Sequence, residues 1–388
     1  MHRANRVSQL GTEGAFEVLA KARALEAQGK KIVHLEIGEP DFDTPQFIKD
    51  AAKKALDDGF THYLPSAGLA DLRLAIAEHI SSTRNIFVDA DEVVITPGAK
   101  PIFNFVINAS INEGDEVICP NPAYPIYESL INFVGGVSVP YILREENGFR
   151  FDWKEVESLV TKKTKMIIIN TPQNPTGGIM TESDIEGVAN LAQQHNLMVM
   201  SDEIYDRIIY DGFVHKSIAS LPGMKERTIL VNGFSKTYAM TGWRLGYGVM
   251  PKEYAKLIAK MQINCTSHAT AFAQVAGANA LRGPQDEIFT MVEEFQRRRD
   301  TIVSGLNSIP GVHCHKPLGA FYVFPNIKKT GKDSKTLADI LMNEAGIACL
   351  PGTAFGKAGE GYLRFSYATS VANIEEAIKR FDATVRKF

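Results

Sequence analysis

The stretch TILVNGFSKTYAMTGWRLGYGVM, Thr228 to Met250, decides the expected fold. It contains two short apolar runs, TILVNGF and LGYGVM, on either side of a segment that holds Lys236 and Arg244 but no acidic residue. Short apolar runs that alternate with helical stretches indicate buried strands. A lysine on a helix normally has a carboxylate one turn away. Lys236 therefore either faces water or meets a negative charge that the chain does not supply.

The same rhythm extends upstream to Val93, through the runs EVVITPG, EVICP, VSVPYI, KMIIINTP and LMVMSDE. It predicts an α/β fold, with a large domain whose mostly parallel central sheet is flanked by helices. After about Gly283 the pattern changes to a long helix near 287–306 and then to mixed short strands and helices. Both chain ends are expected to form a smaller α+β domain. The predicted division is 1–45 for the N-terminal arm and part of the small domain, 46–285 for the large domain, and 286–388 for the C-terminal small domain.

Several helices can be assigned to residue ranges from apolar periodicity and from the glycines and prolines at their ends. The predicted ranges are 16–28, 45–58, 334–344 and 373–387. Gly29 is expected to end the first of them, and Pro101 to occupy the first turn of a helix that follows the VVIT strand.

Composition excludes several classes of protein. The 388 residues carry a net charge of −3, so no basic surplus indicates nucleic-acid binding. No apolar run approaches the roughly 18 residues of a membrane helix, and the N-terminus lacks the apolar region of a signal peptide. The four cysteines are far apart, which favours a reducing cytoplasm and predicts neither a metal site nor a disulfide framework. They are Cys119, Cys265, Cys314 and Cys349.

Polar residues follow four of the predicted strands, where a parallel α/β sheet places its ligand sites. Gly98-Ala99-Lys100 precedes a helix, an arrangement that suits an anion. TPQNPTGG supplies an amide, SDEIYD a carboxylate and a phenol, and NGFSKT the lysine. Taken singly, TPQNPTGG is typical of a turn, SDEIYD of a helix cap, and the lysine of NGFSKT of a surface residue. Their order along the chain favours one shared site.

The chain resembles the fold-type I, pyridoxal-phosphate-dependent aminotransferases of class I/II, the aspartate aminotransferase family. The motifs that carry the resemblance follow the family's order over nearly the whole chain: GEPDFDTP, THYLPSAGLADLR, NTPQNPTGG, SDEIY, NGFSKTYAMTGWRLGY, PGTAFG and YLRFSYAT. The resemblance implies that pyridoxal 5′-phosphate is the cofactor and supplies the missing negative charge. It also implies ping-pong transfer of an amino group from an L-amino acid to a 2-oxo acid.

The resemblance assigns a role to each motif residue. Lys236 would bond to the cofactor aldehyde and later move a proton. Asp202 would keep the ring nitrogen protonated, and Tyr205 and Asn174 would contact the ring's 3′ oxygen. The remaining cofactor-binding residues implied are Gly98, Ala99, Lys100, Tyr124, Ser235 and Arg244. Some relatives carry a serine where this chain has Gly233, so one phosphate ligand is absent here.

The same resemblance implies a homodimer with shared active sites, because Tyr63 would reach the cofactor of the neighbouring subunit. Arg364 would bind the substrate α-carboxylate in a pocket lined by the backbone of Gly38 and by Asn174. Lys100 would bind the side-chain carboxylate of an acidic substrate, which favours aspartate with 2-oxoglutarate as the substrate pair. Ala15 stands where one close relative has a threonine that assists acidic recognition, so this preference stays open.

Other readings remain. Phe16, Ile37 and Tyr322 could line an apolar pocket, as in enzymes for aromatic amino acids, alanine or other neutral amino acids. A lyase, a decarboxylase or an aminocyclopropane-carboxylate synthase would keep the same lysine and aspartate. A DNA-binding regulator is disfavoured because too few residues precede KIVHLEIG. A non-catalytic binding protein would not need a proton-shuttling amine.

Overall fold

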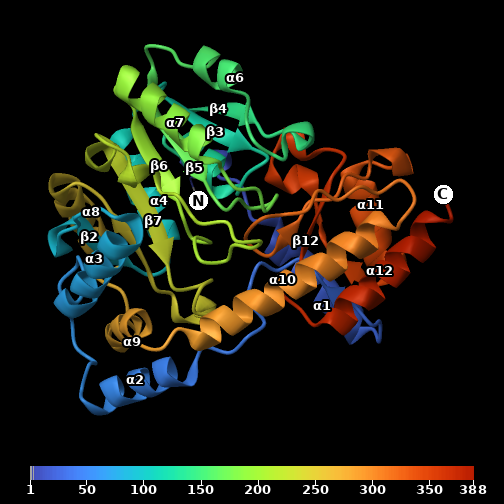
Figure 1. Ribbon diagram of the computed structural model, residues 1–388, viewed down its shortest axis with the longest axis horizontal. Coiled ribbons are helices and arrows are strands. Elements are labelled where there is room, and N and C mark those ends of the chain that lie inside the picture. Colours follow the sequence, from blue (N-terminus) through green and yellow to red (C-terminus); the bar gives the residue numbers. More distant parts are fainter. Residues whose placement is uncertain (1, 3) are drawn as a thin grey trace.

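The computed structural model describes residue 2 and residues 4–388. Its centre is a seven-stranded sheet with the order β2-β8-β7-β6-β5-β3-β4 (Figure 1). Neighbouring strands from β4 to β7 run parallel, and β8 runs antiparallel to both β2 and β7. The mostly parallel sheet expected from the sequence is thus confirmed. Its strands are β2 (Val93–Thr96), β3 (Glu116–Asn121), β4 (Val137–Ile142), β5 (Thr164–Asn170), β6 (Met198–Asp202), β7 (Thr228–Gly233) and β8 (Gly246–Val249).

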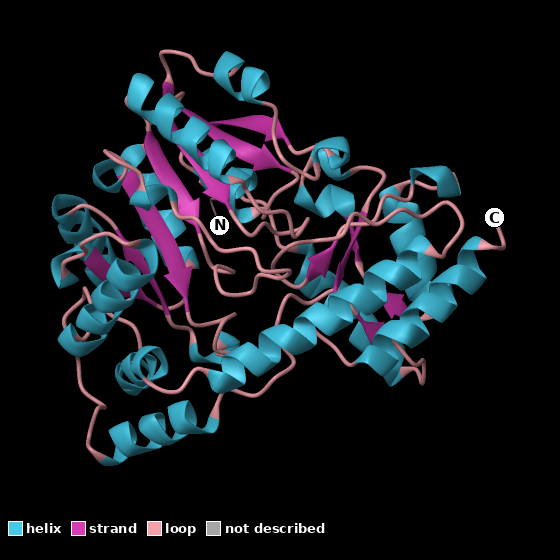
Figure 2. Ribbon diagram, viewed as in Figure 1, coloured by secondary structure: helices cyan, strands magenta, loops and turns pink. Residues whose placement is uncertain are grey.

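Helices cover both faces of this sheet (Figure 2). Side chains of a strand alternate between faces, and β5 shows the result. Met166 and Ile168 pack with residues of α4, α5 and α8, whereas Ile167 and Ile169 pack with residues of α6 and α7. The helices around the sheet are α2 (Gln46–Asp57), α3 (Ala70–Arg84), α4 (Lys100–Ser110), α5 (Ile126–Phe133), α6 (Trp153–Ser158), α7 (Glu182–Gln194), α8 (Lys252–Cys265) and α9 (Ala271–Arg282).

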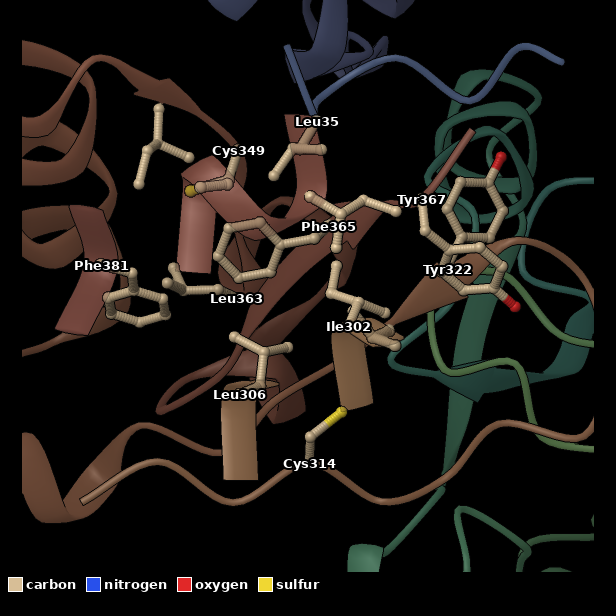
Figure 3. Packing of buried hydrophobic residues seen from close by; sticks show 14 of the residues in the cluster. Leu35, Ile302, Leu306, Cys314, Tyr322, Cys349, Leu363, Phe365, Tyr367 and Phe381 are labelled. Carbon is tan, nitrogen blue, oxygen red and sulfur yellow. The ribbon is translucent and has the colours of Figure 1, made fainter. Parts of the chain in front are cut away.

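The two ends of the chain pack together. β1 pairs in parallel with β10, and β9, β12 and β11 form a small antiparallel sheet. Figure 3 shows Leu35 beside Cys349 and Phe365 in one apolar cluster. The elements of this region are α1 (Gly14–Ala27), β1 (Val33–His34), α10 (Asp286–Asn307), β9 (Tyr322–Val323), α11 (Ser334–Ile340), β10 (Ile347–Ala348), β11 (Leu350–Pro351), β12 (Leu363–Ser366) and α12 (Val371–Val385).

The predicted helix ends are accurate to within a few residues, with one difference. The helix expected over 334–344 is α-helical only to Ile340 and then widens into a π-helical turn, Leu341–Ala345, that ends at Gly346 in the left-handed region. Apolar periodicity does not distinguish these two helix types. The division at 45 and 285 stays a prediction. No helix within the described residues is long and apolar enough to cross a membrane.

A buried ionic cluster holds the loop after β6 against α3. Arg84, at the end of α3, donates to Glu203 at 3.0 Å and pairs with Asp206, and His215 lies 2.8 Å from Glu203. Burial alone would raise the pKa of Glu203, but the charges of His215 and Arg84 outweigh it and lower the pKa to about 2. Buried ion pairs therefore hold the segment that follows Asp202 against α3.

We predict that Arg84→Leu lowers the free energy of unfolding by about 3–5 kcal/mol, because two buried carboxylates lose their cation. Arg282→Leu is the control, since its pair with Asp71 is partly exposed, and it should cost less than about 1 kcal/mol. Urea denaturation followed by circular dichroism measures both. Equal losses in the two variants would contradict the importance of this cluster.

Candidate active site

A cavity of about 530 Å³ lies at the carboxyl ends of the strands. Most residues predicted from the sequence converge on it, from both the sheet and the chain-end region. Those that line it are Gly38, Ala99, Lys100, Tyr124, Asn174, Asp202, Tyr205, Ser235, Lys236, Arg244 and Arg364, together with Ala15, Phe16, Ile37 and Tyr322. The described part of the chain shows no cluster of three or more side chains that could bind a metal.

Lys236 follows β7 and donates from Nζ to the carbonyl oxygen of Gly38. Burial lowers the pKa of Lys236 to about 8; the negative charge of Glu39 opposes this shift, and the cations Arg364 and Arg244 add to it. About a tenth of this amine is therefore uncharged at pH 7, far more than for an ordinary lysine, and the uncharged form is the one that acts as a base or nucleophile.

Gly38 has to be a glycine because of its neighbour Tyr322. A Cβ added at Gly38 would lie 2.0 Å from the Tyr322 hydroxyl oxygen. The missing side chain lets that hydroxyl reach Tyr205, whose hydroxyl lies 2.8 Å away. The carbonyl of Gly38 thus meets Lys236 while its Cα leaves room for the two phenols.

Asp202 ends β6 and is 4% exposed. Burial raises its pKa to about 6, although hydrogen bonds from the Tyr127 hydroxyl and the Ile204 amide act in the opposite direction. A cation placed beside this carboxylate would lower its pKa again. Tyr127 was not predicted from the sequence. It lies in the first turn of α5, three residues after Tyr124, and its ring packs edge-on against that of Tyr124.

Arg364 lies on β12 and is 4% exposed. Its guanidinium lies over the rings of Tyr322 and Phe355, whose centroids are 4.5 and 4.9 Å from Cζ. It donates to the Asn174 side-chain oxygen at 3.3 Å and to the Glu36 carbonyl. Among the described residues its Nε has no hydrogen-bond partner. A buried cation with a free donor is suited to a carboxylate ligand.

The segment before α4 leaves space for an anion. Gly98 has φ 82°, and a Cβ there would lie 2.2 Å from Arg244 Nη2. A Cβ on Gly246 of β8 would lie 2.5 Å from the amide nitrogen of Ala99. Pro101 sits in the first turn of α4, as predicted. Bare backbone, a helix N-terminus and a guanidinium therefore adjoin, which is the donor set that a phosphate requires.

These observations test whether pyridoxal phosphate fits. Its phosphate suits the Gly98–Lys100 segment with Ser235 and Arg244, its ring nitrogen suits buried Asp202, and its aldehyde suits the amine of Lys236. The residues present fit the cofactor. A Cβ added at Gly233 would lie 3.0 Å from the Cα of Gly246, so the packing of β7 against β8 leaves little room for a side chain at this position.

Two predicted residues have surroundings of a different kind, and the contact expected of Tyr63 with a second subunit stays a prediction. Tyr63 is outside the cavity, 90% exposed, with its ring edge-on to His268 at 5.7 Å. Lys100 lines the cavity, but its amine is paired with the carboxylate of Glu13, which also accepts a hydrogen bond from the Tyr124 hydroxyl at 3.0 Å. Glu13 was missed because 87 residues separate it from Lys100.

The chain is similar to known aminotransferases over nearly its whole length. The family model "Aminotransferase class I and II" matches residues 30–381. An aspartate aminotransferase of Pyrococcus abyssi is 46% identical over 92% of both chains. An aromatic-amino-acid aminotransferase of Thermococcus litoralis is 43% identical over 93% of this chain and 94% of that protein. The structure of Thermus thermophilus aspartate aminotransferase with maleate superposes with a TM-score of 0.95, at 37% identity, covering 99% of this chain and 100% of that one. The chain belongs to the class I and II aminotransferase family, whose aspartate aminotransferase type uses pyridoxal phosphate.

Proposed function

We propose that this pyridoxal-phosphate-dependent aminotransferase moves the amino group of L-aspartate, or a related amino acid, to 2-oxoglutarate. The observation that carries the proposal is that Lys100 lines the cavity in addition to Arg364. Arg364 can bind the α-carboxylate, and Lys100 lines the same cavity as a partner for a side-chain carboxylate. The relatives named for aspartate support the same substrate.

Aromatic amino acids are a second candidate. Phe16 and Ile37 line the cavity beside Tyr322, so an apolar side chain also finds contacts there. The relative from Thermococcus litoralis is named for aromatic substrates. Both substrate classes share the α-amino and α-carboxylate groups, and the site differs for them only at the side chain.

Each residue contributes a defined action. When bound, pyridoxal phosphate withdraws electrons from the substrate Cα and so acidifies its hydrogen. Lys236 Nζ, uncharged in part near neutral pH, would take that proton from the substrate Cα and deliver it to the C4′ carbon of the cofactor. Asp202 holds the proton on the ring nitrogen, and Tyr205 donates a hydrogen bond to the 3′ oxygen. Arg364 orients the substrate by its α-carboxylate, which satisfies the free Nε.

A homodimer with shared sites is part of the proposal. Tyr63 has 90% of its surface exposed and does not line its own cavity. An exposed tyrosine of this kind suits a contact with the second subunit, whose phosphate it would reach. A cytoplasmic location also stays a proposal, supported by the four free cysteines.

A donor screen tests the activity. We expect the enzyme to convert aspartate with 2-oxoglutarate at the highest kcat/KM, and phenylalanine at a lower one. With an amino acid alone it should stop after one half-reaction, whereas a lyase would continue to turn over.

Lys236→Ala should lower turnover by at least about a thousandfold, because it removes both nucleophile and base. Full activity of that variant would refute the assigned chemistry.

The pH dependence of Lys236 can be measured without turnover. In cofactor-free protein we expect labelling of Lys236 by acetic anhydride to rise tenfold per pH unit and level off above about 8. The sign follows because only the neutral amine reacts. An unperturbed lysine has a pKa near 10.4, so its labelling rate would still be rising between pH 8 and pH 10. Residue-resolved mass spectrometry supplies the rates; a profile still rising at pH 10 would contradict the lowered pKa.

Arg364→Ala should lower kcat/KM by about a hundredfold or more, because a bidentate contact with the α-carboxylate is lost. Aspartate and phenylalanine should suffer by similar factors, since both carry that group. Steady-state kinetics with each donor decides the matter. A loss confined to aspartate would mean that Arg364 reads the side-chain carboxylate instead.

A further inference from the structure

Glu13 is bound to Lys100, the residue proposed above as the partner of a substrate's second carboxylate. Its Oε1 atom pairs with Lys100 Nζ and accepts from the Tyr124 hydroxyl at 3.0 Å. The ammonium of Lys100 also lies 5.8 Å from the centroid of the Tyr124 ring. The ammonium of Lys100 is thus already paired with a carboxylate from the chain itself.

We propose that Glu13 is a specificity-determining residue that competes with the side-chain carboxylate of dicarboxylic amino acids for Lys100 and Tyr124. This inference rests on the proposed function. The two donors that Glu13 holds are the ones an incoming carboxylate requires. Two carboxylates at one ammonium repel each other, so a dicarboxylic substrate has to displace Glu13 before it binds.

A neutral substrate faces no such competition. It leaves the pair between Glu13 and Lys100 in place, so that Lys100 does not remain as an unmatched cation beside an apolar side chain. Glu13 directly precedes α1, whose residues Ala15 and Phe16 line the same cavity. The same short segment therefore provides both the competing carboxylate and apolar side chains that line the cavity. The arrangement narrows the difference in affinity between acidic and neutral substrates.

The position of Glu13 makes displacement feasible. Its side chain is 24% exposed and that of Lys100 is 44% exposed, so water can solvate the released carboxylate. A partly exposed pair costs less to break than a fully buried one. Glu13 precedes the first helical turn, and its side chain makes no hydrogen bond to cap α1.

Ligand binding to the holoenzyme tests the proposal without relying on turnover. Succinate carries two carboxylates, and succinamate replaces one of them by an uncharged amide of similar size. Calorimetric titration of Glu13→Gln should show succinate binding tightened by roughly three- to tenfold, with succinamate changed by less than about twofold. Glu13→Ala removes the same charge by truncation and should act in the same direction.

Two further variants locate the effect. Glu17→Gln removes an equal charge from the exposed first turn of α1, outside the cavity, and should leave succinate binding unchanged. In a Lys100→Gln background, the gain from Glu13→Gln should vanish, because the competition is for that ammonium.

Unchanged or weaker succinate binding in both Glu13 variants would overturn the inference, as would an equal gain for succinamate. The proposed function fails by a different result, namely wild-type enzyme that transfers no amino group from any amino acid. The succinate titration tests the role of Glu13 in either case.

Discussion

Two neighbouring carboxylates, Asp202 and Glu203, set the constraint on which the site depends. Glu203 is matched by Arg84 and His215 and has a pKa of about 2, whereas Asp202 receives hydrogen bonds but pairs with no cation among the described residues and has a pKa of about 6. Burial acts on both alike, so the difference lies in their partners. The ion pairs of Glu203 fix the backbone of this loop. Asp202, the next residue along the chain, is thereby held in the cavity lining, where it can pair with a cationic ring.

Local patterns in the sequence predicted much of the fold. Each of the seven apolar runs from Val93 onward is a strand of the central sheet, and the polar residues after them meet in one cavity because carboxyl ends of parallel strands share an edge. What stayed hidden depends on contacts between distant segments. The burial of Arg364, the pair between Arg84 and Glu203, and the position of Glu13 follow from packing that no local pattern encodes.

The charges around the cavity explain why substrate preference is harder to predict than chemistry. In the proposed mechanism Lys236 and Arg364 act on atoms that every α-amino acid carries, and Asp202 acts on the cofactor ring. These roles therefore do not depend on the substrate side chain. Lys100 could favour a carboxylate, but Glu13 matches its charge, while Phe16 and Ile37 offer apolar contacts. The sequence alone shows that Lys100 is present, but it does not show that Glu13 of the same chain forms an ion pair with it.

Helix α10 links the sheet region to the cluster formed by the chain ends (Figure 1). It runs unbroken for 22 residues, about 33 Å, so each degree of tilt at one end displaces the other by about 0.6 Å. Lys236 stands on the sheet side of the cavity and Arg364 on the chain-end side. A tilt of a few degrees about the sheet end of this helix would therefore move its other end by more than about 1 Å.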